Sequence, residues 1–182
     1  MSNHPLTPEH DPDPQRKTVL NLYAALAVSI ILTFMPNTIM AIVSLVFVIG
    51  VLVASYSIRK KAEPESLAEN HATYIIRTIW IASFISVITL GIGAVILLND
   101  IDYSAFGGCP IDLEFAASAD YMQLWEVMQP CYDTFITDNW NILIISGAIT
   151  ILPILLYLVI RFVKGLSRAI KGYRIANPKA WF

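Results

Sequence analysis

The chain has 182 residues, of which 56% are hydrophobic and only 14% are charged, with a formal net charge of −2. This composition is too apolar for an ordinary soluble domain of that length, so it predicts an all-α multipass membrane protein. It also excludes a typical nucleic-acid binder, which presents a concentrated basic surface to solvent.

The chain begins with a polar segment, residues 1–17, that contains four prolines and several acidic residues. Such a segment cannot bury enough apolar surface to offset the entropy of ordering, so we expect a disordered tail. Its two histidines, His4 and His10, are expected to be solvated, and no metal ligands are predicted anywhere in the chain.

Two apolar stretches follow, residues 19–35 and 38–58, and Pro36 and Asn37 separate them. A single helix over both would be about 60 Å long, twice the hydrocarbon thickness. We therefore expect a helical hairpin with a tight turn, in which Asn37 adopts left-handed backbone angles. A re-entrant hairpin is the alternative, but a turn inside the bilayer would leave unpaired backbone groups that need protein cover.

The third helix is expected to begin in water and then cross the bilayer. Ser66 and Glu69 fit a capping box, and residues 74–98 carry a single charge, Arg77. Arg77 has two interpretations. Its long side chain can extend to the interface, or it can join His71 and Glu69 in a buried polar node with another helix.

Residues 99–139 contain none of the twelve Lys and Arg residues but eight of the fourteen acidic ones. By the positive-inside rule this segment lies outside the cytoplasm and both termini lie inside it. We therefore predict a protein of the bacterial inner membrane whose residues 99–139 form a periplasmic loop.

The same loop holds the only two cysteines, Cys109 and Cys131. An oxidising compartment favours a disulfide between them, which stabilises the loop by about 3 kcal/mol in the chain-entropy model. Two unpaired thiols are the alternative.

An amphipathic helix is expected between the cysteines, because apolar residues recur three or four positions apart, at Leu113, Ala117, Tyr121, Leu124 and Met128. A disulfide holds its two Cα atoms within roughly 7 Å, whereas a straight helix over residues 112–128 is about 25 Å long. The sequence therefore predicts a shorter helix, near residues 117–128, that lies on the membrane or under a partner.

The last crossing is predicted over residues 141–163, with Asp138 as its N-cap. Beyond the membrane the helix is expected to continue to about position 171 as a basic extension. Residues 172–182 are then expected to return to the interface. One face of this extension is expected to contact anionic lipid headgroups at about 1 kcal/mol per residue, through Arg161, Lys164, Arg168 and Lys171.

Three segments carry a resemblance to a known group. They are the hairpin followed by RKK at 59–61, ENHATYIIRTIW at 69–80, and YLVIRFVKGLSRAIKGYRIANP at 157–178. Together they resemble small uncharacterised bacterial multipass membrane proteins related to the chloroplast import-translocon-like domain of unknown function. Members of this group have an acidic residue and a histidine just before an Arg-Thr-aromatic motif at the point where a helix enters the membrane. The matching residues here are Glu69, His71, Arg77, Thr78 and Trp80. The resemblance implies no activity.

These patterns predict a non-enzymatic accessory, scaffold or assembly subunit with a membrane-protein partner or a second copy, and with no cofactor or catalytic residue. Pairs of small residues allow close helix packing, within the bundle or with a partner: Ala82 and Ser86, Thr89 and Gly93, Gly50 and Ala54. Transport by an oligomer is one alternative. A thiol-disulfide enzyme is another, although the quinone reductase it resembles uses a second cysteine pair in its first outer loop.

Overall fold

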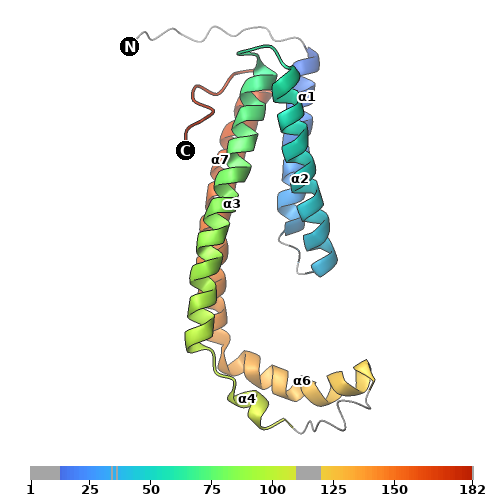
Figure 1. The fold of residues 1–182 in the computed structure, drawn as a ribbon, viewed down its shortest axis with the longest axis vertical. Coiled ribbons are helices and arrows are strands. Elements are labelled where there is room, and N and C mark those ends of the chain that lie inside the picture. Colours follow the sequence, from blue (N-terminus) through green and yellow to red (C-terminus); the bar gives the residue numbers. More distant parts are fainter. Residues whose placement is uncertain (1–12, 34, 36, 110–119, 182) are drawn as a thin grey trace. The chain divides into compact units, whose positions relative to one another are not determined.

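A computed structural model describes residues 13–33, 35, 37–109 and 120–181, and every regular element in these ranges is a helix. The helices are α1 (Asp13–Thr33), α2 (Thr38–Lys61), α3 (Leu67–Asp100), α4 (Ser104–Gly107), α6 (Tyr121–Asp138) and α7 (Trp140–Ile170) (Figure 1). Within the described ranges, α1, α2, α3 and α7 are long and apolar enough to cross a membrane. The prediction of an all-helical chain with four candidate spans is therefore confirmed.

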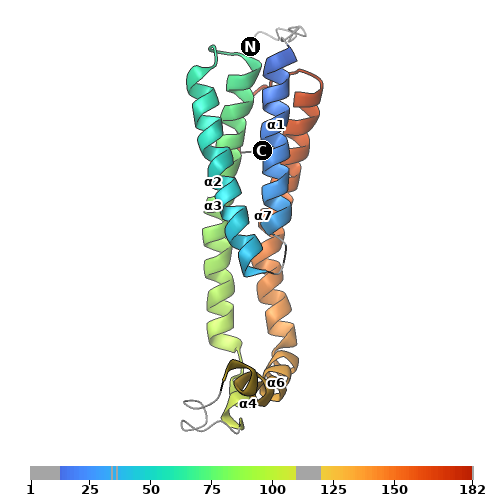
Figure 2. The ribbon, with the colours of Figure 1, turned by 90° about the vertical axis from the view of Figure 1, so that its right-hand side faces the viewer.

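The chain forms two compact units. The first comprises residues 1–85 and 155–182, and the second comprises residues 86–154. In the first unit α1 and α2 lie side by side as a hairpin next to the first half of α3 and the second half of α7 (Figure 2). Their shared core consists of Val19, Leu22, Tyr23, Leu26, Val51, Leu67, Ala68, Ile75, Ile79 and Ala169.

Helix α1 begins earlier than the sequence suggests. The predicted disordered tail extended to residue 17, but α1 already begins at Asp13, so this boundary is wrong. The reason is Pro14, whose fixed φ and missing N–H are harmless in the first helical turn. The hydroxyl of Thr18 donates to the Pro14 carbonyl one turn later, at 2.9 Å. His4 and His10 lie outside the described residues.

Asn37, at the end of the hairpin turn, differs from the expectation in its backbone conformation and in its role. Asn37 has φ −147°, which is extended rather than left-handed backbone. Its side-chain oxygen instead accepts the N–H groups of Ile39 and Met40, at 2.8 and 3.4 Å. Asn37 is therefore the N-cap of α2, and it satisfies donors that the first turn leaves unpaired.

Only half of the predicted capping box forms at the start of α3. The Ser66 hydroxyl accepts the Glu69 N–H at 3.2 Å. The Glu69 carboxylate does not return to Ser66. It accepts the Thr73 hydroxyl at 3.0 Å, while the Ser66 N–H donates to the Glu63 carbonyl.

In the second unit the end of α3 and the start of α7 pack through small polar residues. The Ser146 hydroxyl donates to the Gly93 carbonyl at 3.1 Å, and the Thr150 hydroxyl approaches the Thr89 carbonyl at 3.5 Å. A Cβ on Gly93 would stand 2.4 Å from Thr150 Oγ1, so only glycine permits this approach. The predicted pair Thr89 and Gly93 therefore packs within the chain rather than against a partner.

The amphipathic helix is longer than predicted and begins later. Helix α6 begins after Asp120, which forms a complete capping box with Gln123, and it continues through Pro130 to Asp138. Cys131 consequently lies inside the helix. Asp138 is the last residue of α6, so its predicted role as N-cap of the final span is wrong. Two residues of the predicted stripe, Leu113 and Ala117, lie outside the described residues.

Helix α7 ends where the sequence predicts. Gly172 has φ +72°, the left-handed conformation that glycine adopts without a Cβ penalty. Its N–H donates to the Ala169 carbonyl, and the Tyr173 N–H donates to the Arg168 carbonyl. This pair of bonds is a Schellman motif, and it reverses the chain at the end of α7.

Candidate functional site

The buried polar groups of the first unit gather between the start of α3, the end of α7 and the segment after Gly172. Five side chains along α3 take part, and their spacings of one, three, three and one place them on neighbouring faces of the helix: Asn70, His71, Tyr74, Arg77 and Thr78. We call residues 173–181 the C-terminal strap. Figure 1 shows this segment beside α3 and α7.

The Asn70 side chain holds the strap by binding backbone groups of Ile175. Its side-chain N–H donates to the Ile175 carbonyl at 3.0 Å, and its oxygen accepts the Ile175 N–H at 2.8 Å. Both residues are buried, at 9% and 3% exposure. The paired bonds satisfy the N–H and the C=O of Ile175, and leaving either buried without a partner costs about 1–3 kcal/mol per group.

His71 joins three segments of the chain. One ring nitrogen, Nε2, lies 3.1 Å from the Tyr173 carbonyl, and the other, Nδ1, lies 3.0 Å from the Tyr23 hydroxyl. A carbonyl can only accept, so we assign the proton to Nε2. Nδ1 then accepts the Tyr23 hydroxyl proton. The imidazole therefore links α1, α3 and the strap without an open position for a ligand.

Tyr23 reaches His71 because α1 and α7 approach closely at Gly165. A Cβ at this glycine would stand 2.3 Å from the Tyr23 hydroxyl oxygen and under 3 Å from its ring. The ring also packs edge-on to Phe162, with centroids 6.0 Å apart. Gly165 is thus required by the tyrosine that completes the histidine bridge.

Arg161 is the most buried cation of the described chain, with 0% exposure. Its guanidinium donates to the Thr78 hydroxyl at 3.1 Å, to the Ala180 carbonyl at 2.9 Å and to the Tyr74 carbonyl at 3.4 Å. It also lies 3.7 Å from the centre of the Tyr74 ring, within cation–π range. The prediction that Arg161 contacts lipid headgroups is therefore wrong, because the strap and α3 enclose it.

The other members of the predicted basic face differ in exposure. Lys164 and Lys171 are exposed, whereas Arg168 is half-buried and donates to the Arg174 carbonyl at 3.0 Å. Lipid contact by these three residues stays a prediction.

The predicted polar node of Glu69, His71 and Arg77 does not form as one cluster. Glu69 binds Thr73, and His71 binds Tyr23 and the strap. Arg77 is half-buried and donates to the Lys179 carbonyl at 3.1 Å, while its buried Nε has no hydrogen-bond partner among the described residues. His71 and Arg77 therefore hold different points of the same strap.

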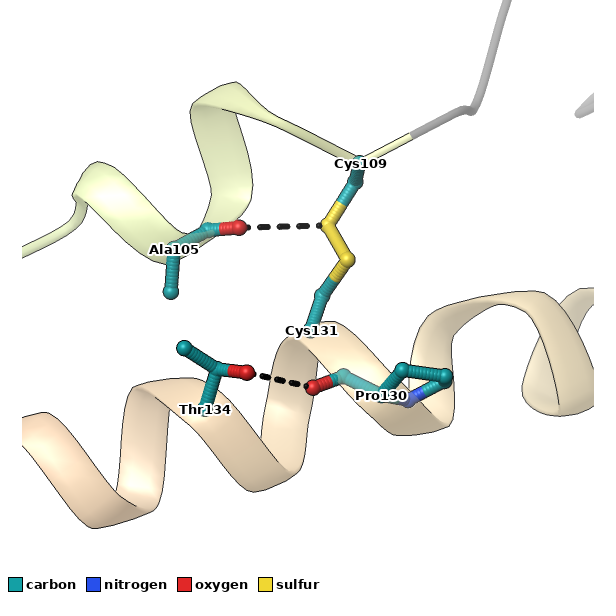
Figure 3. The surroundings of a disulfide bond; sticks show 5 residues. All are labelled: Ala105, Cys109, Pro130, Cys131 and Thr134. Atoms are coloured by element: carbon teal, nitrogen blue, oxygen red, sulfur yellow. Dashed lines mark hydrogen bonds between the residues drawn. A yellow bond between two sulfur atoms is a disulfide. The ribbon is translucent and has the colours of Figure 1, made fainter.

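In the second unit the predicted disulfide is confirmed. Cys109 follows α4, Cys131 lies one residue after Pro130 in α6, and their Cα atoms are 6.1 Å apart (Figure 3). Phe106 of α4 packs on Phe135, one turn beyond Cys131, with ring centroids 4.9 Å apart. The bridge therefore fastens α4 to one face of α6.

A pair of hydrogen bonds joins the segment after α3 to the start of α7. The Asn139 side chain accepts the Asp102 N–H at 2.7 Å and donates to the Asp102 carbonyl at 2.8 Å. The Asp102 carboxylate in turn accepts the Ser104 N–H, and this hydrogen bond lowers the pKa of the Asp102 carboxyl. Asn139 is the single residue between α6 and α7, so it fixes where the two helices meet.

Comparison with protein-family models, curated proteins and solved structures finds no match. The resemblance given by the sequence motifs therefore stays a prediction. Its residues lie at the strap site or near it: Thr78 accepts from Arg161, and the Trp80 indole N–H donates to the Tyr56 hydroxyl at 3.1 Å. Within the described residues, no group of three or more His, Cys, Asp or Glu side chains could hold a metal ion.

Sequence reasoning missed Asn70 and Tyr74 as site residues, and it named Thr78 only as part of the motif that carries the resemblance. A usable signal was present, because polar and aromatic side chains follow one another at helical spacing just where α3 turns apolar. The strap that they bind could not be found this way, since they bind its backbone carbonyl and N–H groups, which every residue carries and which leave no pattern in the sequence.

Proposed function

We propose that this chain is a non-enzymatic integral protein of the bacterial inner membrane and acts as an accessory, scaffold or assembly subunit of a larger complex. The observation that carries the proposal is a shallow apolar groove on α3, lined by Val87, Ile88, Gly91, Ile92, Val95 and Ile96. Nothing lies within 4 Å of the position that a Cβ on Gly91 would take. A missing side chain among branched ones lets the backbone of a second helix approach closely.

The partner in this proposal is a transmembrane helix, from another membrane protein or from a second copy of the chain. The groove lies in the part of α3 between Arg77 and Asp100 that carries no charge, where Val87 and Val95 are 73% and 57% exposed. Helix association in a bilayer depends on close packing rather than on water exclusion, so groove shape matters more than the amount of apolar surface.

The use of the polar groups supports a structural role. Asn70, His71 and Arg161 each bind backbone groups of the chain itself, at 2.8–3.1 Å for their shortest bonds to the strap. Buried polar side chains in a catalytic or transport site are expected to face a cleft instead. Here they hold the strap to the two longest helices.

The charge distribution supports the orientation, with both termini in the cytoplasm and residues 99–139 in the periplasm. In that orientation Lys164 and Lys171 face the anionic inner leaflet. A thiol-disulfide enzyme is not favoured, because both cysteines of the sequence are used in one bridge and no second pair is present to relay electrons.

The proposal is tested by filling the groove. Gly91→Leu closes it, whereas Ala94→Leu adds the same side chain at an exposed position of the same helix outside the groove. After extraction in a mild detergent, light scattering should give the wild type and Ala94→Leu a protein mass above that of one chain, and Gly91→Leu the mass of one chain. One-chain mass for the wild type, or an unchanged mass for Gly91→Leu, contradicts the proposal.

Identification of the bound chain then separates the scaffold from transport by an oligomer. A different protein supports the scaffold. A second copy, together with solute flux in proteoliposomes that Gly91→Leu abolishes, supports transport.

A further inference from the structure

Helix α6 has one apolar face that the chain covers and one that it does not. The covered face carries Cys131 and Phe135, which contact α4 through the disulfide and the Phe106 ring. The neighbouring face carries Tyr121, Trp125 and Tyr132, spaced four and seven residues apart and therefore on one stripe. These three side chains are 77%, 45% and 45% exposed.

Two of the three exposed aromatic side chains lie close together. The rings of Trp125 and Tyr132 lie 6.1 Å apart, almost two helical turns along α6. Across the helix from this stripe most exposed residues are polar, with Pro130 as the exception: Gln123, Glu126, Asp133 and Thr137. Helix α6 thus has an exposed aromatic face in addition to the apolar face that packs on α4.

The position of α6 in the chain indicates that it lies near the surface of the bilayer. Asn139 alone separates α6 from α7, and its two hydrogen bonds to Asp102 hold the ends of α3 and α7 together. Figure 1 shows α6 extending sideways from the start of α7. Two further exposed aromatic residues, Tyr103 and Trp140, lie at the same ends, at 58% and 57% exposure. A helix that leaves the end of a span sideways, one residue before that span begins, starts at the level of the lipid headgroups.

We infer that α6 is an interfacial helix whose stripe of Tyr121, Trp125 and Tyr132 inserts into the outer surface of the bilayer. Tyrosine and tryptophan favour this level because each has an apolar body and a polar group that stays hydrated. The apolar face of such helices is buried about 5–10 Å into the boundary between headgroups and acyl chains.

The charges of residues 99–139 indicate which class of lipid headgroup α6 contacts. Residues 99–139 contain no Lys or Arg, and α6 carries Glu126 and Asp133 on its polar face. Electrostatic attraction to anionic lipid therefore contributes nothing, and insertion depends on the aromatic side chains alone. The ligand is the interface of a zwitterionic phospholipid. This inference requires that α3 and α7 span a bilayer, but it is independent of the groove at Gly91.

The test uses the full chain in phosphatidylcholine nanodiscs whose acyl chains carry bromine, a contact quencher of tryptophan. Replacing Trp80, Trp140 and Trp181 with phenylalanine leaves Trp125 as the only tryptophan. Its emission should be blue-shifted, mostly lost with bromines near the headgroup, largely kept with bromines near the chain ends, and insensitive to iodide in water. If the triple variant does not form the disulfide, the difference between wild type and Trp125→Phe gives the same reading.

Two matched single-tryptophan proteins make the result decisive. One carries Gln123→Trp on the polar face, which should respond to iodide and not to bromine. The other keeps Trp140, which reports whether the spans are inserted. Quenching of Trp140 without quenching of Trp125 overturns the inference, whether Trp125 proves open to iodide or covered by protein. Failure of both to respond to bromine overturns the membrane insertion itself.

Discussion

Replacing Arg161 with methionine tests the buried anchor of the strap. Methionine keeps much of the apolar stem but removes three hydrogen bonds and the cation–π contact. Each bond from a charged donor contributes about 1.5–3 kcal/mol and the aromatic contact about 2 kcal/mol. The desolvation of a guanidinium, several kcal/mol, offsets part of that sum. We expect a net loss of about 2–4 kcal/mol in the free energy of unfolding.

The alternative role for Arg161 predicts a different magnitude. A headgroup contact contributes about 1 kcal/mol and weakens with salt. Lys164→Met, which changes an exposed residue on the next turn of α7, is the matched control and should cost about 1 kcal/mol or less. The assay is unfolding by sodium dodecyl sulfate in mixed micelles, followed by circular dichroism at two salt concentrations. Equal, salt-dependent losses for both variants would refute the buried anchor.

Three further perturbations follow from the contacts. Gly165→Ala should destabilise the chain by about 1–3 kcal/mol, because the new Cβ meets both the hydroxyl oxygen and the ring of Tyr23; a Tyr23→Phe background should recover part of this loss, and no loss in either background would contradict the close approach at Gly165. Asn70→Leu removes both bonds to Ile175 and should raise hydrogen exchange at that amide while α2 stays protected; unchanged exchange contradicts the role of Asn70. Cys131→Ser should lower stability by about 3 kcal/mol in non-reducing conditions, with no further loss on adding reductant; a further loss would mean that the reductant acts elsewhere than on the bridge.

The helices could be predicted because their signals are local. Residues 141–170 contain no acidic residue and are mostly apolar or basic, and Gly172 supplies the left-handed residue that ends the helix. Asp120 was missed as the start of α6 because the apolar periodicity continues upstream of it, and periodicity does not show where a helix begins. The helix extends past Pro130 because Cys131 and Phe135 both contact α4, and such tertiary contacts outweigh the poor helix propensity of proline.

The candidate site was harder to predict because its partners are distant in sequence. Arg161 follows the same three- and four-residue spacing as Lys164 and Arg168, so the sequence gives no reason to separate it from a lipid-facing set. Its guanidinium is enclosed by α3 and by the strap, both distant from it in sequence or folded back on it. His71 likewise was expected beside Arg77, yet Tyr23, 48 residues away, supplies one of its partners.

The central claim, that α3 receives a partner helix at Gly91, is tested most directly by a photo-reactive amino acid in intact membranes. Val95 lines the groove and Leu90 does not, although the two are similarly exposed, at 57% and 62%. Irradiation should give one discrete protein adduct from position 95, none from position 90, and none from position 95 when Gly91→Leu is added. Lipid adducts alone at both positions, or the same protein adduct from both, would contradict a specific helix-binding groove.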